Sequence, residues 1–262
     1  MSRRDIAGLL IDVDGVLHID GDPLPGAAQA LQALRTRGIP FVLLTNTTIR
    51  TRRQLGQLLR DLGFPVTDDD IVTAGAATAA YLRTHYPNQP CFLLVDGDVR
   101  EEFVGIPLVE DDSARVVVFG GAGPAYSYDR VNRAFRLLLR GAAFIAMHRN
   151  LVWERRDGPA LDTGAFLLGI EAAVGRQPHL VGKPSPDFFQ AGLTRLGLPP
   201  ERVAMVGDSL TADILPAREL GMTGILVRTG RFRERDLEQG QPDVLLDSIA
   251  DLPAWLEHRS EQ

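Results

Sequence analysis

The sequence predicts an α/β protein whose core is a Rossmann-like, doubly wound parallel sheet. Short apolar runs alternate along the chain with amphipathic segments of helical length, as they do in βαβ units. Several of these runs are apolar throughout, which is typical of parallel strands buried on both faces. Three of the runs end in polar residues, and a lysine follows a fourth. Open α/β sheets bind their ligands at these strand ends, so the pattern also predicts a ligand site.

The expected elements of the core lie in two separate parts of the chain. In the first part we predict strands at 6–10, 40–44 and 71–72 and helices at 27–37, 51–62 and 73–86. In the second part, which resumes near His179, we predict strands at 202–206, 224–227 and 244–246 and helices at 186–196, 210–220 and 247–258. Glycine or proline ends most of these helices, as Gly38, Gly63 and Pro87 illustrate.

The region between these parts has its own alternating pattern. It contains predicted strands at 91–95, 115–119 and 142–147 and predicted helices at 128–139 and 162–174. These elements are enough to form a small core of their own. We therefore predict a discontinuous core domain, residues 1–79 and 179–262, interrupted by an inserted α/β domain at 80–178.

Composition and charge exclude several classes of protein. The 262 residues are 45% hydrophobic and 24% charged, which is ordinary for a soluble globular chain. A net charge of −6 argues against nonspecific binding of nucleic acid. No apolar run approaches the ~20 residues of a membrane span, and Asp12 interrupts the run that follows the basic N-terminus, so no export signal is expected. We expect a cytoplasmic protein with neither a nucleic-acid nor a membrane partner.

Two acidic residues, Asp12 and Asp14, close the first predicted strand. Side chains two positions apart in an extended chain share a face. Two carboxylates about 4 Å apart repel by roughly 4 kcal/mol at an effective dielectric near 20. Such a pair persists if a cation neutralises it, if a proton is shared, or if both groups stay in water. A solvated turn is the alternative interpretation.

Further polar residues follow other predicted strands. Their positions at strand ends predict one crevice with four carboxylates, one hydroxyl and one ammonium group, which together suit a divalent cation and a phosphate-sized anion. The residues are Asp12, Asp14, Thr45, Lys183, Asp208 and Asp213.

These segments resemble a known family. Residues 12–17 (DVDGVL), Thr45, Lys183, and Gly207-Asp208 with Asp213 are similar, in this order, to the four motifs of the haloacid dehalogenase (HAD) superfamily. The insert is similar to the C2-type cap of the NagD-like phosphatases, subfamily IIA. Segments 23–27, 44–46 and 181–186 most resemble the branch of phospholysine, phosphohistidine and inorganic pyrophosphate phosphatases. The resemblance extends over nearly the whole chain.

The resemblance implies a mechanism. A phosphorylated metabolite, pyrophosphate or a phosphoramidate would be hydrolysed through an aspartyl phosphate on Asp12, with Asp14 as general acid and base. Thr45 and Lys183 would bind the phosphoryl group, and Asn46 would orient substrate or cap the turn after it.

The same resemblance implies Mg²⁺ as the cofactor. Its protein ligands would be Asp12, the main-chain carbonyl of Asp14, and Asp208. Asp213 would bind a metal-bound water or hold Lys183.

Selectivity is expected in the cap. The resemblance implies that Asp162, Thr163 and Gly164 face the active site. His148, Arg149, Trp153 and Arg155 are candidate contacts for the phosphate or the leaving group, and an ordinary surface turn explains them equally well. Similar proteins commonly form homodimers through the cap.

Other functions stay open at this point. Within the fold these are a dehalogenase, a phosphomutase, or a sugar, nucleotide or pyridoxal phosphate phosphatase of the NagD type. The alternative that is not an enzyme is a protein that binds a phosphorylated ligand without catalysis. The retained Asp14 argues against a dehalogenase, because halide departure needs no general acid.

Overall fold

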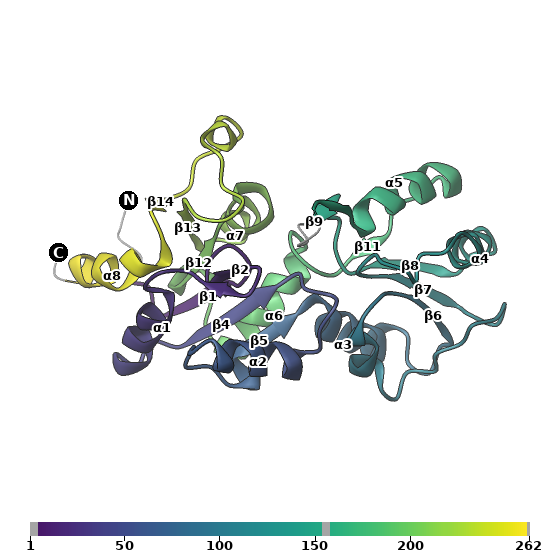
Figure 1. The fold of residues 1–262 in the computed structure, drawn as a ribbon, viewed down its shortest axis with the longest axis horizontal. Helices are drawn as coiled ribbons and strands as arrows, with labels where there is room; N and C mark the ends of the chain where they lie inside the picture. Colours follow the sequence, from purple (N-terminus) through teal and green to yellow (C-terminus); the bar gives the residue numbers. More distant parts are fainter. Residues whose placement is uncertain (1–4, 154–157, 261–262) are drawn as a thin grey trace. The chain divides into compact units, whose positions relative to one another are not determined.

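The computed structural model describes residues 5–153 and 158–260, and they form two compact units (Figure 1). The first unit contains the described residues up to Thr45, the segment Leu55–Val72, and those from Pro184 onward. The second contains Asn46–Gln54 and the described residues of Thr73–Lys183. This division differs from the predicted boundaries because three short segments, 46–54, 73–79 and 179–183, group with the second unit.

A six-stranded sheet forms the centre of the first unit, in the order β14-β13-β12-β1-β4-β5. Its strands are β1 (Gly8–Asp12), β4 (Phe41–Thr45), β5 (Ile71–Thr73), β12 (Val203–Gly207), β13 (Thr223–Val227) and β14 (Val244–Leu246). The pairings from β14 to β4 are parallel, and Leu10 lies in register with Met205 on one side and Val42 on the other. Strands β1, β4 and β12 are buried along their whole length, which explains their unbroken apolar runs.

Helices pack on both faces of this sheet. The helices of the unit are α1 (Ala27–Thr36), α2 (Arg52–Asp61), α6 (Pro186–Leu196), α7 (Leu215–Glu219) and α8 (Leu252–Ser260). Leu31 of α1 and Leu256 of α8 belong to one buried cluster with Leu9 of β1. On α6, Gly192 lies against Leu10, whose side chain points to the opposite face from that of Leu9. The predicted doubly wound α/β core is confirmed.

The second unit is built on its own parallel sheet, in the order β11-β8-β7-β6. Its strands are β6 (Cys91–Leu94), β7 (Val116–Phe119), β8 (Ala143–Ala146) and β11 (His179–Leu180). Its helices are α3 (Ala74–His85), α4 (Tyr128–Leu139) and α5 (Thr163–Val174), and β9 (Val152–Trp153) pairs with β10 (Ala160–Leu161). One buried cluster contains residues of α4 and α5, and another contains residues of α3. Because β11 pairs with β8, the core sheet does not resume at His179 as expected.

Shorter elements complete the structure. They are the hairpin β2 (His18–Ile19) and β3 (Asp22–Pro23) and the 3₁₀ turns Asp68–Asp70, Asp98–Phe103, Pro200–Arg202, Glu234–Glu238 and Ile249–Asp251. The helix predicted at 210–220 is instead a π-helical turn, Leu210–Ile214, followed by α7. The backbone N–H of Leu215 donates to Leu210 O, five residues back. Pro216 offers no N–H to the turn before it, so ordinary α-helical bonding is interrupted there.

Across the residues described, no helix has both the length and the apolar character needed to cross a membrane.

The contact between α6 and the sheet gives a test of the packing. A Cβ at Gly192 would lie 2.8 Å from Leu10 Cδ2 and 3.2 Å from Leu44 Cδ2, and both leucines are fully buried. Gly192→Ala should therefore lower the free energy of unfolding by roughly 1–3 kcal/mol through overpacking, as measured by urea denaturation. Gly169→Ala is the matched control on α5, because nothing lies within 4 Å of its Cβ position. Helix propensity should make that variant more stable by roughly 0.5–1 kcal/mol. A Gly192→Ala protein as stable as Gly169→Ala would contradict the packing described.

Candidate active site

Three buried carboxylates meet at the carboxyl end of the central sheet in the first unit. Asp12 is the last residue of β1, Asp208 directly follows β12, and Asp213 lies in the π-helical turn. One carboxylate oxygen of each lies within 4.8 Å of the other two. The side chains are almost inaccessible, with exposed fractions of 7%, 2% and 1%. Strands β1 and β12 are neighbours from which the chain winds in opposite directions, and this switch point is where such sheets bind ligands.

Backbone donors hold the three carboxylates in place. The N–H of Val13 donates to Asp12 Oδ1 over 2.8 Å, and that of Ser209 donates to Asp213 Oδ2 over 3.1 Å. The N–H of Arg231, in the loop after β13, donates to Asp208 Oδ2 over 2.7 Å. Each acid thus accepts a hydrogen bond from a main-chain N–H that helps to orient it.

Two glycines leave the space that Asp208 occupies. Gly15 has φ +84° and Gly230 has φ +62°, and a Cβ at either position would lie 2.0 Å from Asp208 Oδ2. The hydroxyl of Thr229 donates to Gly15 O over 2.6 Å and joins the two loops. These positions require glycine both for the backbone conformation and for the close approach.

The electrostatics of the cluster suit a cation. Burial, and then repulsion from Asp12 and Asp213, raises the pKa of Asp208 to about 8. Burial acts to lower the pKa of Arg231, but attraction to the carboxylates of the site raises it overall. Three crowded carboxylates provide hard oxygen donors, and a divalent cation would relieve their repulsion. The residues present therefore fit Mg²⁺.

Asp14 and Thr45 lie beside each other in the same unit. The Thr45 hydroxyl donates to Asp14 Oδ2 over 3.3 Å. The Asp14 side chain is 54% exposed, so its carboxyl group can exchange protons with solvent. The ring of His18 is buried, and its Nε2 lies 3.9 Å from Asp14 Oδ1.

Lys183 lies in the second unit, directly after the segment that continues β11. It is 4% exposed. Its main-chain N–H donates to Asn46 Oδ1 over 2.8 Å, and its carbonyl accepts from Asn46 Nδ2 over 2.9 Å.

Several known proteins are similar to this chain in sequence and in fold. The family described as haloacid dehalogenase-like hydrolase matches residues 9–107, and a second, HAD-hydrolase-like description matches residues 180–252. Haloacid dehalogenase-like hydrolase domain-containing protein 2 of Homo sapiens is 37% identical over 243 residues, which cover 93% of this chain and 92% of the relative.

The chain belongs to the haloacid dehalogenase-like hydrolase family. Phospholysine phosphohistidine inorganic pyrophosphate phosphatase of Danio rerio is 33% identical, over 95% of this chain and 92% of the relative. The p-nitrophenyl phosphatase of Archaeoglobus fulgidus has a TM-score of 0.89 at 30% identity, over 96% and 99% of the two chains. NagD of E. coli K-12 has a TM-score of 0.85 at 31% identity, over 94% and 98%. The predicted NagD-like placement within the HAD family is confirmed.

Several residues expected at the cap of this HAD hydrolase form a buried polar network in the second unit. His148 Nε2 lies 3.3 Å from Thr48 Oγ1 and 3.7 Å from Asp162 Oδ1. His148 Nδ1 accepts from the N–H of Asn150, which assigns the ring proton of neutral His148 to Nε2. Asp162 caps α5 by accepting from the N–H of Thr163 over 2.7 Å. His148 is 1% exposed, so it is not the surface residue that an ordinary turn would carry.

The other expected cap residues have local roles in that unit. Gly164 approaches the chain so closely that a Cβ would lie 2.2 Å from Arg149 O. The guanidinium of Arg149 pairs with Glu171 over 2.7 Å. Trp153 ends β9 and is half-buried, and Arg155 lies outside the described residues.

The sequence did not lead us to expect the loop after β13 at the carboxylate site. The role of Arg231 was not predicted: the residue is exposed, but its backbone N–H donates to Asp208 Oδ2, and attraction to the carboxylates of the site raises the pKa of its guanidinium. The signal was present, because Thr229 and Gly230 follow an apolar strand as the other site residues do. Applying the strand-end rule to β13 would have found them.

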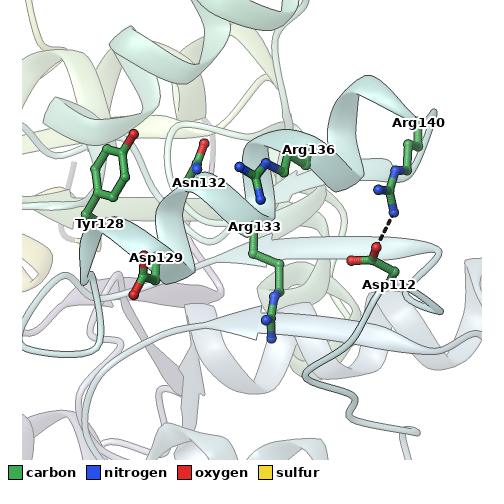
Figure 2. Close-up of a pocket in the computed structure, with 7 residues that line it drawn as sticks. All are labelled: Asp112, Tyr128, Asp129, Asn132, Arg133, Arg136 and Arg140. Carbon is green, nitrogen blue, oxygen red and sulfur yellow. Dashed lines mark hydrogen bonds and ion pairs between the residues drawn. The ribbon is translucent and has the colours of Figure 1, made fainter.

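The second unit also contains an open hollow of about 610 Å³ along α4. Arg133, Arg136 and Arg140 line it, and Arg140 pairs with Asp112 (Figure 2). Among the residues that the structure describes, none of those expected at the site lines this hollow.

The close approach at Gly230 gives a test of the carboxylate site. Gly230→Ala should push Asp208 aside, and we expect the Mg²⁺ concentration for half-maximal activity to rise about 10-fold or more. Gly38→Ala is the matched control, because Gly38 has a similar φ of +67° with nothing within 4 Å of its Cβ position. Gly38→Ala should introduce a similar backbone strain, but the Mg²⁺ concentration for half-maximal activity should stay unchanged. An equal rise in both variants would show that strain, and not contact with Asp208, is responsible.

Proposed function

We propose that this chain is a Mg²⁺-dependent phosphatase that hydrolyses a small phosphorylated metabolite, pyrophosphate or a phosphoramidate through an aspartyl phosphate on Asp12. The observation that carries the proposal is the cluster of Asp12, Asp208 and Asp213, three buried carboxylates at the switch point of a HAD sheet. Three buried acids are costly to keep together without a cation, and a nucleophilic carboxylate among them suits phosphoryl transfer.

The proposed reaction has two steps. A carboxylate oxygen of Asp12 forms a bond to phosphorus while the bond from phosphorus to the leaving group breaks, and Asp14 gives its proton to the leaving oxygen or nitrogen. Asp14 then takes a proton from a water molecule, whose oxygen attacks phosphorus and releases phosphate from Asp12. The exposure of the Asp14 side chain, at 54%, suits a group that must meet both leaving group and water.

Charge stabilisation is assigned to the remaining residues. Asp12, the main-chain carbonyl of Asp14, and Asp208 would hold Mg²⁺, and Asp213 would hold a water of its coordination shell. Bound there, Mg²⁺ would neutralise the phosphoryl oxygens and the crowded acids. The Thr45 hydroxyl would donate a hydrogen bond to an oxygen of the phosphoryl group, and the Lys183 ammonium would neutralise its negative charge.

The names of the relatives support the substrate classes. Proteins similar to this chain include a p-nitrophenyl phosphatase and phospholysine phosphohistidine inorganic pyrophosphate phosphatases. In aryl phosphates, pyrophosphate and phosphoramidates, the phosphoryl group is bonded to an oxygen or nitrogen atom that can accept a proton as the leaving group departs. We therefore propose this range of P–O and P–N substrates for the chain.

The deciding experiment measures phosphate release from p-nitrophenyl phosphate and from pyrophosphate. We expect release with Mg²⁺ and none with a chelator, and we expect Asp12→Asn to reduce the rate at least 10³-fold, because the amide is not a nucleophile. Asp22→Asn is the control, since it changes an exposed acid of β3 in the same unit.

Two outcomes would contradict the proposal. Full activity in Asp12→Asn would exclude the aspartyl phosphate. Binding of phosphate by the wild-type protein without turnover of either compound or of a phosphoramidate would indicate a non-catalytic binding protein instead.

A further inference from the structure

The side chain of Asn46 pairs with the main chain of Lys183. The amide group uses both of its polar atoms, because Nδ2 donates to the Lys183 carbonyl over 2.9 Å and Oδ1 accepts from the Lys183 N–H over 2.8 Å. This is the pattern by which a neighbouring β-strand would pair with Lys183. Reversing the amide would place a donor against the N–H and an acceptor against the carbonyl, so the bonding itself fixes its orientation.

Gly182 makes this approach possible. Its N–H donates to Met147 O over 2.9 Å, which extends the contact between the β8 and β11 segments beyond their last paired residues, Ala146 and Leu180. A Cβ at Gly182 would lie 2.6 Å from Asn46 Oδ1 and 2.3 Å from Met147 O. The absence of a side chain at this position therefore lets the amide of Asn46 reach the main chain of Lys183.

The position of the Lys183 ammonium depends on how firmly its backbone is held. A lysine side chain is a flexible stem with a point charge at its end, so it does not define its own direction. Pro184 disfavours the α-helical conformation for the preceding residue, Lys183, and so limits its backbone freedom. The two hydrogen bonds from Asn46 constrain the same peptide groups from the side.

We propose that Asn46 is a positioning residue that fixes the backbone of Lys183, and thereby its ammonium group, rather than a ligand of phosphate through its side-chain amide. The inference rests on the proposed function, in which Lys183 neutralises the phosphoryl group. It assigns Asn46 a different role from the two expected from the sequence, which were orienting substrate and capping the turn after it.

A double-mutant cycle tests this role. Asn46→Ala should lower kcat/KM for p-nitrophenyl phosphate by about 10- to 100-fold in the wild-type protein. If Asn46 acts through Lys183, the same change made in Lys183→Ala should alter the rate less than about 3-fold. Asn132→Ala is the matched control: it removes a half-buried asparagine of α4 (Figure 2) whose side chain has no hydrogen bond to another described residue, and it should leave the rate unchanged.

Two further measurements do not depend on turnover. The dissociation constant of inorganic phosphate in Mg²⁺, measured by calorimetry, should follow the same cycle. Hydrogen exchange at the Lys183 amide, measured by NMR, should be slow in wild type and in Asn132→Ala and should accelerate at least 10-fold in Asn46→Ala, because the acceptor is lost.

The outcomes separate this inference from the proposed function. Equal losses from Asn46→Ala with and without Lys183 would show that Asn46 contacts the phosphoryl group directly, and unchanged activity in Asn46→Ala would show that the pairing has no catalytic importance. Either result overturns the inference. Full activity in Asp12→Asn would instead overturn the aspartyl phosphate, while the exchange measurement would still report whether Asn46 holds Lys183.

Discussion

Mutual repulsion among Asp12, Asp208 and Asp213 is the constraint on which the rest of the first unit depends. Buried like charges are unfavourable, so each needs compensation from groups nearby in space. The main-chain N–H groups of three separate loops supply part of it, and the charge of Arg231 supplies more. A parallel sheet can meet this demand because it brings the ends of distant strands to one edge.

The sequence was sufficient to predict the groups that lie on strand ends. Asp12, Thr45 and Asp208 each follow an apolar run, and both the run and its end are local signals. The contribution of Arg231 was not predictable in the same way, because it depends on how the loop after β13 folds back toward Asp208. The π-helical turn was also missed, since a 3.6-residue period describes its apolar positions as well as it describes those of a regular helix.

The sequence was less informative about the division of the chain between the two units. Residues 46–54 include the start of the core helix predicted at 51–62, and the core was predicted to resume near His179, yet both segments group with the second unit. Pairing partners of a short strand are decided by register and neighbours far along the chain, which periodicity does not encode. Thr45 and Lys183 are each the last residue before the chain passes from one unit to the other.

The π-helical turn Leu210–Ile214 constrains the number of residues in this segment as well as their identity. Asp213 lies five positions after Asp208, and the hydrogen bond from Leu215 N–H to Leu210 O accommodates one residue more than an α-helical turn does. Deleting a single residue here would let the turn relax to ordinary helical spacing and would rotate the following side chains by roughly 100°. Natural variation in this segment should therefore take the form of substitutions, whereas insertions and deletions should be confined to open turns such as the one at Gly21.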